Sequence, residues 1–238
     1  MIGLVRRIVV ISVVMLALFA CEVVVALAAS GGESTPISKT QAVAFAKAVN
    51  LRASDLPGAK RGEVPSYERA QNEREAQVSW AKTVRCARHD LAAHRPIDVG
   101  APVSLLLYGP WHVADRVRVM PSESVAASEV GAFASKRGHL CFARAAQVSV
   151  TSANEPPENP EPLKTTFLQL GRSLGVGAIG VQTVSSATGS RALYSDAVLF
   201  RVGSAEIEFV AVGRQPFPAA TERRLLSLLY SRAKAHNV

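Results

Sequence analysis

The sequence predicts an α+β fold, a twisted antiparallel sheet flanked by helices in one domain. The first observation is a pair of apolar segments, 196–202 and 205–212, separated only by Gly203-Ser204, which is typical of a two-residue hairpin turn. The second is the amphipathic helix pattern of residues 220–236. The third is the mixed order of helical and strand-like segments, because a parallel sheet would alternate them regularly.

The chain begins with a segment that we expect to lie outside this fold. Residues 1–29 have two early arginines, a long apolar run and small residues near their end, as in an export signal or a membrane anchor. Three alternatives stay open: cleavage at an Ala-x-Ala pattern, lipidation of Cys21, or retention of residues 8–29 as a membrane span. In each of them the rest of the chain is extracytoplasmic, either membrane-anchored or secreted.

The extracytoplasmic domain is predicted to span residues 38–238, after a linker at 30–37. Its two cysteines, Cys86 and Cys141, form an even pair in an oxidising compartment, which predicts one disulfide. The chain-entropy model gives the closed loop about 4 kcal/mol of stabilisation. We expect a structural bond, since no Cys-x-x-Cys motif indicates redox chemistry or metal binding.

Two helices are predicted in the first part of the domain. Ser38 is the expected N-cap of the first, and Asp55-Leu-Pro-Gly58 predicts a turn soon after it. Residues 65–89 become more apolar along their length, which indicates a second helix. The side chains expected in the core are Val43, Phe45, Ala46 and Val49 from the first helix, and Trp80, Val84 and Cys86 from the second.

Two strands should follow. The apolar run 101–108 ends at Gly109-Pro110, and residues 113–120 alternate in the manner of a half-buried strand. The valines expected on the buried side of the second strand are Val113, Val117 and Val119.

A short helix is predicted after Pro121, and another strand at residues 140–151, which would carry Cys141 into the sheet. The prolines and acids of residues 153–164 indicate a polar loop inside the domain. The helix positions expected to face inward are Val125, Ala126, Val130 and Phe133.

The hairpin and the last helix complete the predicted sheet layer. In the second hairpin strand Ile207, Phe209 and Ala211 share one face, whereas Glu206 and Glu208 point the other way. We therefore expect at least one side of the sheet to be partly in water. The buried stripe of the last helix is expected to consist of Leu225, Leu226, Leu229 and Ala233.

The net charge of +8 is spread over scattered basic pairs, and aromatic residues make up only 6% of the chain. A nucleic-acid surface needs a concentrated basic face with aromatic platforms, so none is predicted. Attraction to anionic lipid headgroups or cell-wall polymers stays open. Among the five histidines only His89 and His94, beside Asp90, approach a ligand spacing, and we predict no metal or other cofactor.

Residues 171–180, GRSLGVGAIG, match two catalytic patterns, G-x-S-x-G and G-x-G-x-x-G. In the first, Ser173 would be the nucleophile of an exported serine hydrolase, with Asp196 and His236 as acid and base. The tight hairpin after it leaves no room for the crossovers of a parallel hydrolase sheet. In the second, a helix should follow, whereas residues 181–186 alternate as a strand. We therefore predict a glycine-rich turn and no catalytic residue.

Three segments carry a resemblance to a family. They are AVNLRASDLPG at 48–58, the separated cysteine pair with VRVMPSESVAASEVGAF at 117–133, and SDAVLFRVGSAEIEFVAVG at 195–213. Together they resemble actinobacterial envelope proteins described as lipoproteins or sensor-domain proteins. These are similar to the extracellular sensor domains of mycobacterial-type kinases and to proteins of PsbP-like fold. The resemblance implies a helix-flanked antiparallel sheet and carries no functional residues.

The function predicted from these observations is binding or sensing by a non-enzymatic protein of the cell envelope. The expected ligand is a lipid, a glycolipid or a partner protein at the membrane. Membrane association is expected where the leader is retained or lipidated. The alternative is the exported serine hydrolase that would use Ser173.

Overall fold

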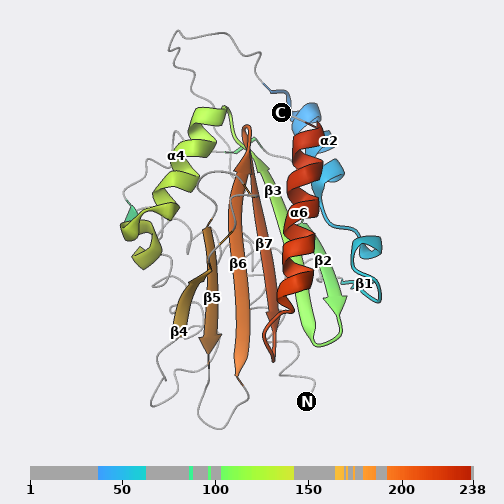
Figure 1. The fold of residues 1–238 in the computed structure, drawn as a ribbon. Helices are drawn as coiled ribbons and strands as arrows, with labels where there is room; N and C mark the ends of the chain where they lie inside the picture. The colour runs from blue at the N-terminus through green and yellow to red at the C-terminus, as the bar shows by residue number, and fades with distance from the viewer. Residues whose placement is uncertain are drawn as a thin grey trace, which may run out of the picture.

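The computed structural model describes residues 37–62, 86–87, 96–97, 103–141, 164–168, 170, 174, 179–185 and 192–236. It confirms the α+β fold class, since the strands of this part of the chain form one seven-stranded antiparallel sheet in the order β1-β2-β3-β7-β6-β5-β4 (Figure 1). The strands are β1 (Lys60–Arg61), β2 (Val103–Tyr108), β3 (Trp111–Val119), β4 (Lys164–Leu168), β5 (Ile179–Ser185), β6 (Leu193–Val202) and β7 (Ala205–Gly213).

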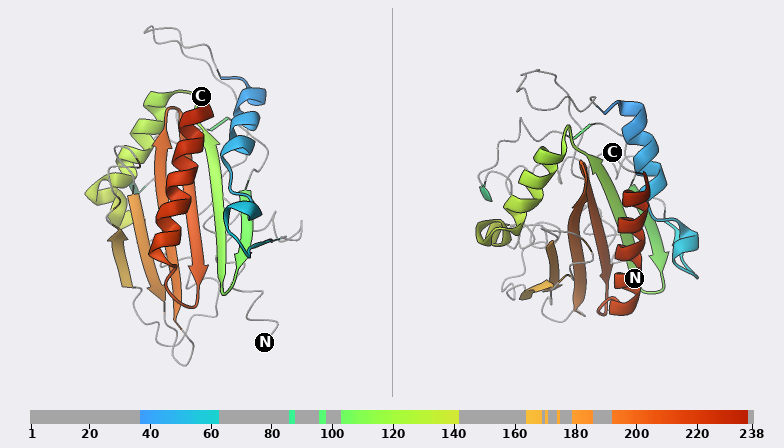
Figure 2. Two further views of the ribbon diagram at one scale, coloured as in Figure 1. Left: turned by 45° about the vertical axis from the view of Figure 1, so that its right-hand side comes forward. Right: turned by 45° about the horizontal axis from the view of Figure 1, so that its top comes forward.

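Helices cover both faces of the sheet (Figure 2). Helices α2 and α6 pack side by side on one face, which we call the α2/α6 face, and α4 lies against β5, β6 and β7 on the other, the α4 face. A short 3₁₀ helix, η1, follows α2. The bounds are Lys39–Val49 for α2, Ala53–Asp55 for η1, Glu123–Ala134 for α4 and Ala219–His236 for α6.

Helix α2 begins where the sequence predicts. The hydroxyl of Ser38 accepts a hydrogen bond from the amide of Gln41 at 3.2 Å, and the Gln41 side chain accepts one from the amide of Ser38 at 2.9 Å. This reciprocal pair is a capping box, which satisfies two amides that the first helical turn leaves open. The turn after η1 is also confirmed, with Gly58 at φ 85°.

The hairpin that joins β6 to β7 is confirmed as well. Val202 pairs directly with Ala205, so the turn consists of Gly203 and Ser204 alone. Gly203 has φ 56°, a left-handed conformation that glycine adopts without the steric cost of a side chain. The tight connection places β7 beside β6, and its pairing with β3 on the other side makes it the central strand.

The main core fills the space between the sheet and the two helices α2 and α6. Phe200 of β6 and Phe209 of β7 are fully buried there, beside the apolar stripe predicted for the last helix. That stripe is confirmed, because Leu225, Leu226, Leu229 and Ala233 are all buried.

Strand β3 differs from the half-buried strand that the sequence predicts. Val113 and Val117 are fully buried on the α2/α6 face as expected, but Ala114 and Arg118 on the other face are only 1% and 5% exposed. At β7 the expectation of a partly wet side holds only in part, since Glu206 is 0% exposed whereas Glu208 is half-buried. Both strands are central in the sheet, and α4 brings Glu129 over Arg118 and Glu206.

Cys141 is also placed differently. It ends a helical segment, residues 136–141, whereas the sequence predicts that a strand begins at residue 140. The segment folds back tightly onto α4, since a β-carbon on Gly138 would lie 2.1 Å from the carbonyl oxygen of Ala132. Glycine at this position therefore makes a local turn that a strand pattern does not reveal. Residues 142–151 of the predicted strand lie outside the described residues.

Other predictions also fall outside the described residues. They concern the leader, most of the linker, most of the helix at 65–89, most of the loop at 153–164, the histidines 89 and 94, and Ser173. Among the described helices, none is long and apolar enough to cross a membrane.

Candidate binding site beneath helix α4

Helix α4 begins and packs as its sequence predicts, with one addition. The Ser122 hydroxyl caps the helix by accepting a hydrogen bond from the amide of Val125 at 3.3 Å. Val125 itself is half-buried, while the side chains that α4 buries are Ala126, Glu129, Val130 and Phe133. Glu129 is the addition, because a carboxylate is rarely buried unless a charged or polar partner meets it.

That partner is Arg118 of β3. Its guanidinium lies 2.8 Å from the Glu206 carboxylate of β7 and 3.6 Å from the Glu129 carboxylate of α4. We call these three residues the buried ion cluster, since all of their side chains are at most 5% exposed. Removing one member of a buried pair leaves an unpaired charge and costs about 3–5 kcal/mol. The cluster therefore ties α4 to the centre of the sheet.

Burial sets the proton affinity of this cluster. Desolvation raises the pKa of Glu206 to about 8; Arg118 opposes the shift, whereas the carboxylates of Glu129 and Glu208 add to it. Burial also raises the pKa of Glu208, against the charges of Arg118 and Arg116. Desolvation and the neighbouring carboxylates therefore favour protonation among these acids, while Arg118 favours the ionised form of the Glu206 carboxylate that it contacts.

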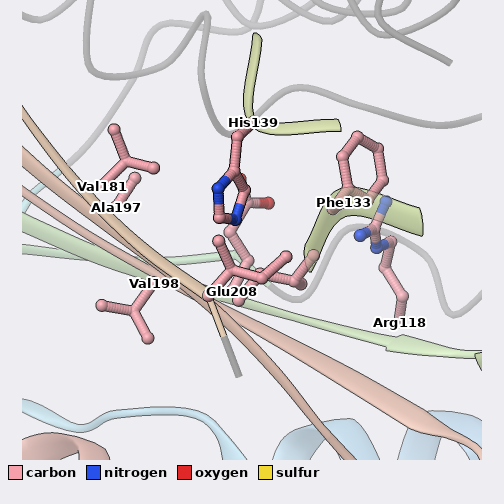
Figure 3. A pocket seen from close by; sticks show the side chains of 9 residues that line it. Arg118, Phe133, His139, Val181, Ala197, Val198 and Glu208 are labelled. Carbon is pink, nitrogen blue, oxygen red and sulfur yellow. The ribbon is translucent and has the colours of Figure 1, made fainter. Parts of the chain in front are cut away.

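A cavity of about 30 Å³ opens beside the cluster (Figure 3). Its apolar wall comes from Phe133 of α4 and from strands β5 and β6. The sheet residues in this wall are Ile179, Val181, Ala197, Val198 and Leu199. The volume is room for about two water molecules, or for the tip of an apolar chain.

Three polar side chains complete the lining of the cavity: Arg118, His139 and Glu208. Figure 3 shows the His139 imidazole directed towards the sheet, where Glu208 lies, while Arg118 and Phe133 stand together at the other end. The cavity thus combines apolar walls with charged and hydrogen-bonding groups, which is the usual composition of a ligand site.

The segment that carries His139 is held in place from two sides. The Ser135 hydroxyl donates to the carbonyl of Ala132 at 2.6 Å and accepts from the amide of Gly138 at 2.9 Å, so it links this segment to α4. At the other end Cys141 is bonded to Cys86, with 5.6 Å between the α-carbons, as the sequence predicts. The disulfide therefore supports one wall of the cavity.

A second set of charged groups lies on the α2/α6 face. Asp115 of β3 is fully buried and accepts hydrogen bonds from the hydroxyl of Ser104 and from the amide of Leu51, the latter at 3.1 Å. Burial raises the pKa of Asp115 to about 7 in spite of these bonds. Asp55 receives two hydrogen bonds from Arg232 of α6, at 2.7 and 2.8 Å. These contacts join the end of α2, η1 and α6 to the sheet.

Two residues of the alternative hydrolase triad, Asp196 and His236, are not brought together. Asp196 is buried in β6, where its carboxylate accepts from the Gln182 amide at 2.8 Å and its pKa is raised by burial. It interacts with Glu222 in the first turn of α6, whose pKa is raised to about 7 by burial and by Asp196. His236 is the last residue of that helix, about 21 Å further along the axis, and is exposed. Asp196 therefore cannot orient His236.

The dinucleotide pattern also lacks its structural context. Residues Ile179–Ser185, which include Gly180, the last glycine of the pattern, form strand β5. A pyrophosphate-binding loop would need a helix at this place, because the helix N-terminus receives the negative charge. The sequence prediction of a strand here is confirmed. Among the described residues, no group of three His, Cys, Asp or Glu side chains could hold a metal ion.

The sequence contains a signal for the buried ion cluster that periodicity alone does not expose. Arg118 lies directly opposite Glu206 across β3 and β7, and Arg116 lies opposite Glu208. Each strand alternates these charges with apolar residues, so opposite charges on one face would follow from the register of the two strands. The register pairs strands that are far apart in the sequence, so local patterns do not reveal it. No sequence pattern marks His139 as a residue of the cavity.

Neither a protein-family model nor a curated protein matches this chain. Among solved structures, it is similar to the crystal structure of the extracellular domain of PknH from Mycobacterium tuberculosis, with a TM-score of 0.44 and 11% sequence identity. The alignment covers 84% of this chain and 98% of that chain. The PsbP-like fold and the lipoprotein character that the sequence resemblance implies stay predictions.

Proposed function

We propose that this protein is a non-enzymatic binding module on the outer side of the membrane, and that its ligand is a lipid or glycolipid. The observation that carries the proposal is the cavity beneath α4, whose apolar wall is bordered by Arg118, His139 and Glu208. An apolar chain tip fits the wall, and a polar headgroup finds hydrogen-bonding and charged partners beside it.

The disulfide supports the extracytoplasmic part of the proposal. Cytosolic thiols are kept reduced, whereas a structural bond between Cys86 and Cys141 persists in an oxidising compartment. The bond also stabilises the segment with His139, so the oxidised form is the one with a complete cavity wall.

We expect α4, which forms one wall of the cavity, to move when the ligand enters. The cavity of about 30 Å³ admits only the tip of a chain, and a longer part of the ligand needs the helix to shift. Besides its apolar contacts, α4 is held to the sheet by two ion pairs. Glu129 pairs with Arg118 in the interior, and Glu123 pairs with Arg201 at 2.9 Å near the surface. Such polar attachments can be exchanged for contacts with a polar headgroup.

No observation favours the serine hydrolase alternative. Asp196 of β6 interacts with the first turn of α6, whereas His236 is the last residue of that helix, and the charged groups beneath α4 are engaged with one another. Labelling of Ser173 by a fluorophosphonate probe would nevertheless support the hydrolase alternative.

The test is native mass spectrometry of the full chain extracted from envelope membranes in mild detergent. We expect the wild-type protein to carry a bound apolar molecule, and Ala197→Leu to lose it, because the larger side chain fills the cavity that Ala197 lines. The matched control is Ala44→Leu, the same substitution at an exposed position of α2. Urea denaturation of both variants checks that each is folded.

The bound mass decides between the outcomes. A lipid present in wild type and in Ala44→Leu but absent from folded Ala197→Leu supports the proposal. Equal lipid in both variants, or a bound protein in place of a lipid, contradicts it.

A further inference from the structure

The charge of the described chain is distributed unevenly between the two faces of the sheet. The exposed side chains of α2, α6 and η1, counted with its N-cap residue Arg52, include six basic residues and no acidic one. They are Lys39, Lys47, Arg52, Arg223, Arg224 and Lys234. The other exposed side chains of these helices, including His236, are small or polar, and none is a large apolar group.

The two acids of this layer add little negative charge to its surface. Asp55 is paired with Arg232, which donates both hydrogen bonds to it. Glu222 is half-buried, and burial together with Asp196 raises its pKa to about 7. The outward charge that these three helices contribute is therefore positive at neutral pH, since none of their own exposed side chains is acidic.

The α4 face has a different character. Two of its acids, Glu129 and Glu206, are buried against Arg118, and a third, Glu208, is half-buried in the cavity lining. The exposed charges of α4 and the following segment have both signs: Glu123, Lys136 and Arg137. A basic surface thus covers the α2/α6 face, whereas the cavity lies beneath α4. Figure 2 shows that α4 is on the opposite side of the sheet from α2 and α6.

We propose that the exposed surface of α2, η1 and α6 docks on the headgroups of anionic phospholipids at the outer surface of the membrane. Each basic side chain near an anionic bilayer contributes about 1 kcal/mol, so six of them suffice for stable electrostatic association. The surface lacks large exposed apolar groups, so binding occurs at the headgroups without insertion.

The position of the layer in the chain agrees with this partner. Helix α2 begins at Lys39, ten positions after the end of the predicted leader at residue 29. The expected membrane attachment and the basic layer are therefore adjacent in sequence. Docking through this layer turns the cavity beneath α4 away from the bilayer. The inference does not depend on what the cavity binds.

The test measures lysine acetylation by N-hydroxysuccinimidyl acetate on the full chain in lipid nanodiscs. Lys47 and Lys234 report on the basic layer, and the exposed Lys136 and Lys164 are internal controls elsewhere on the molecule. In discs with phosphatidylglycerol we expect Lys47 and Lys234 to react at least about threefold more slowly than in pure phosphatidylcholine, with the controls unchanged. At 1 M salt the difference should vanish, because the Debye length falls to about 3 Å.

Two variants sharpen the result. Arg223→Glu/Arg224→Glu reverses part of the charge and keeps both reporter lysines, so their protection should be lost. Lys136→Glu/Lys164→Glu changes as much charge away from the layer and should retain it. Equal rates in both kinds of disc contradict the proposal. So does protection by soluble polyphosphate in phosphatidylcholine discs without any from phosphatidylglycerol, which would assign the surface to an anionic polymer.

Discussion

Asp115 shows how burial changes the chemistry of one residue in this fold. One of its oxygens accepts hydrogen bonds from Ser104 and Leu51, whereas the other, Oδ2, has no hydrogen-bond partner among the described residues. Burial raises its pKa from an ordinary value of 3.8 to about 7. The folded protein therefore binds a proton at Asp115 between about pH 4 and pH 7, where the unfolded chain has released it.

The sign of the effect on stability follows directly. Because the folded state binds the extra proton, the contribution of Asp115 to the free energy of unfolding falls as the pH rises from about 4 to about 7. Asp115→Asn keeps the shape and has no titration. We expect its free energy of unfolding to exceed that of wild type by roughly 2–4 kcal/mol at pH 8 and to approach it at pH 4, measured by urea denaturation.

Asp55→Asn is the matched control with the opposite sign. Burial acts to raise the pKa of Asp55, but hydrogen bonds from Arg232 and from the amide of Arg52 outweigh it, and the pKa is lowered. Its stabilisation is present above about pH 4 and is lost as the pH falls further. Asp55→Asn should therefore be less stable than wild type at pH 8. A constant difference between Asp115→Asn and wild type across this range would contradict the assignment for Asp115.

Individual charged residues were the hardest to place from the sequence. Glu206 and Glu208 read as the wet side of a strand, because alternation identifies two faces and does not say what covers them. The burial of Glu206 depends on Arg118 and on α4, which carries Glu129, and both elements precede β7 by more than 70 residues. Such pairing is decided by tertiary structure.

At the scale of elements, local sequence signals were sufficient to predict structures whose hydrogen bonds join residues close together in the chain. The Ser38 cap predicted the start of α2, and Gly203-Ser204 predicted the hairpin of β6 and β7. The strand at 140–151 failed at its start because Gly138 packs against α4 and the disulfide holds Cys141, and neither contact leaves a periodic pattern.

The disulfide is the element-scale feature with the clearest energetic consequence. It closes a loop with a sequence separation of 55 residues, for which the chain-entropy model gives about 4 kcal/mol. We expect Cys86→Ser/Cys141→Ser to lose about this much free energy of unfolding in urea denaturation. A reducing agent should destabilise wild type to the same extent and leave the variant unchanged. A wild-type protein insensitive to reduction would contradict a stabilising bond.

On the scale of the whole molecule, the two faces of one sheet have separate proposed roles. The α2/α6 face holds the main core and carries the exposed basic surface, whereas the α4 face encloses the buried ion cluster and the cavity. The order of the strands places β7 at the centre, so residues that alternate along it contribute to both sides. A ligand in the cavity would therefore contact the strand that also supports the main core.

The most direct measurement of the central claim is photolabelling of the full chain with a fatty acid that carries a diazirine at its chain end. Peptides would be mapped by mass spectrometry, with unlabelled fatty acid as competitor. We expect labelling in the peptides that contain Phe133, Val181 and Leu199, which line the cavity, and we expect unlabelled fatty acid to reduce it. Labelling confined to α2 and α6, or labelling that the competitor does not reduce, would contradict the claim that the cavity beneath α4 is the binding site.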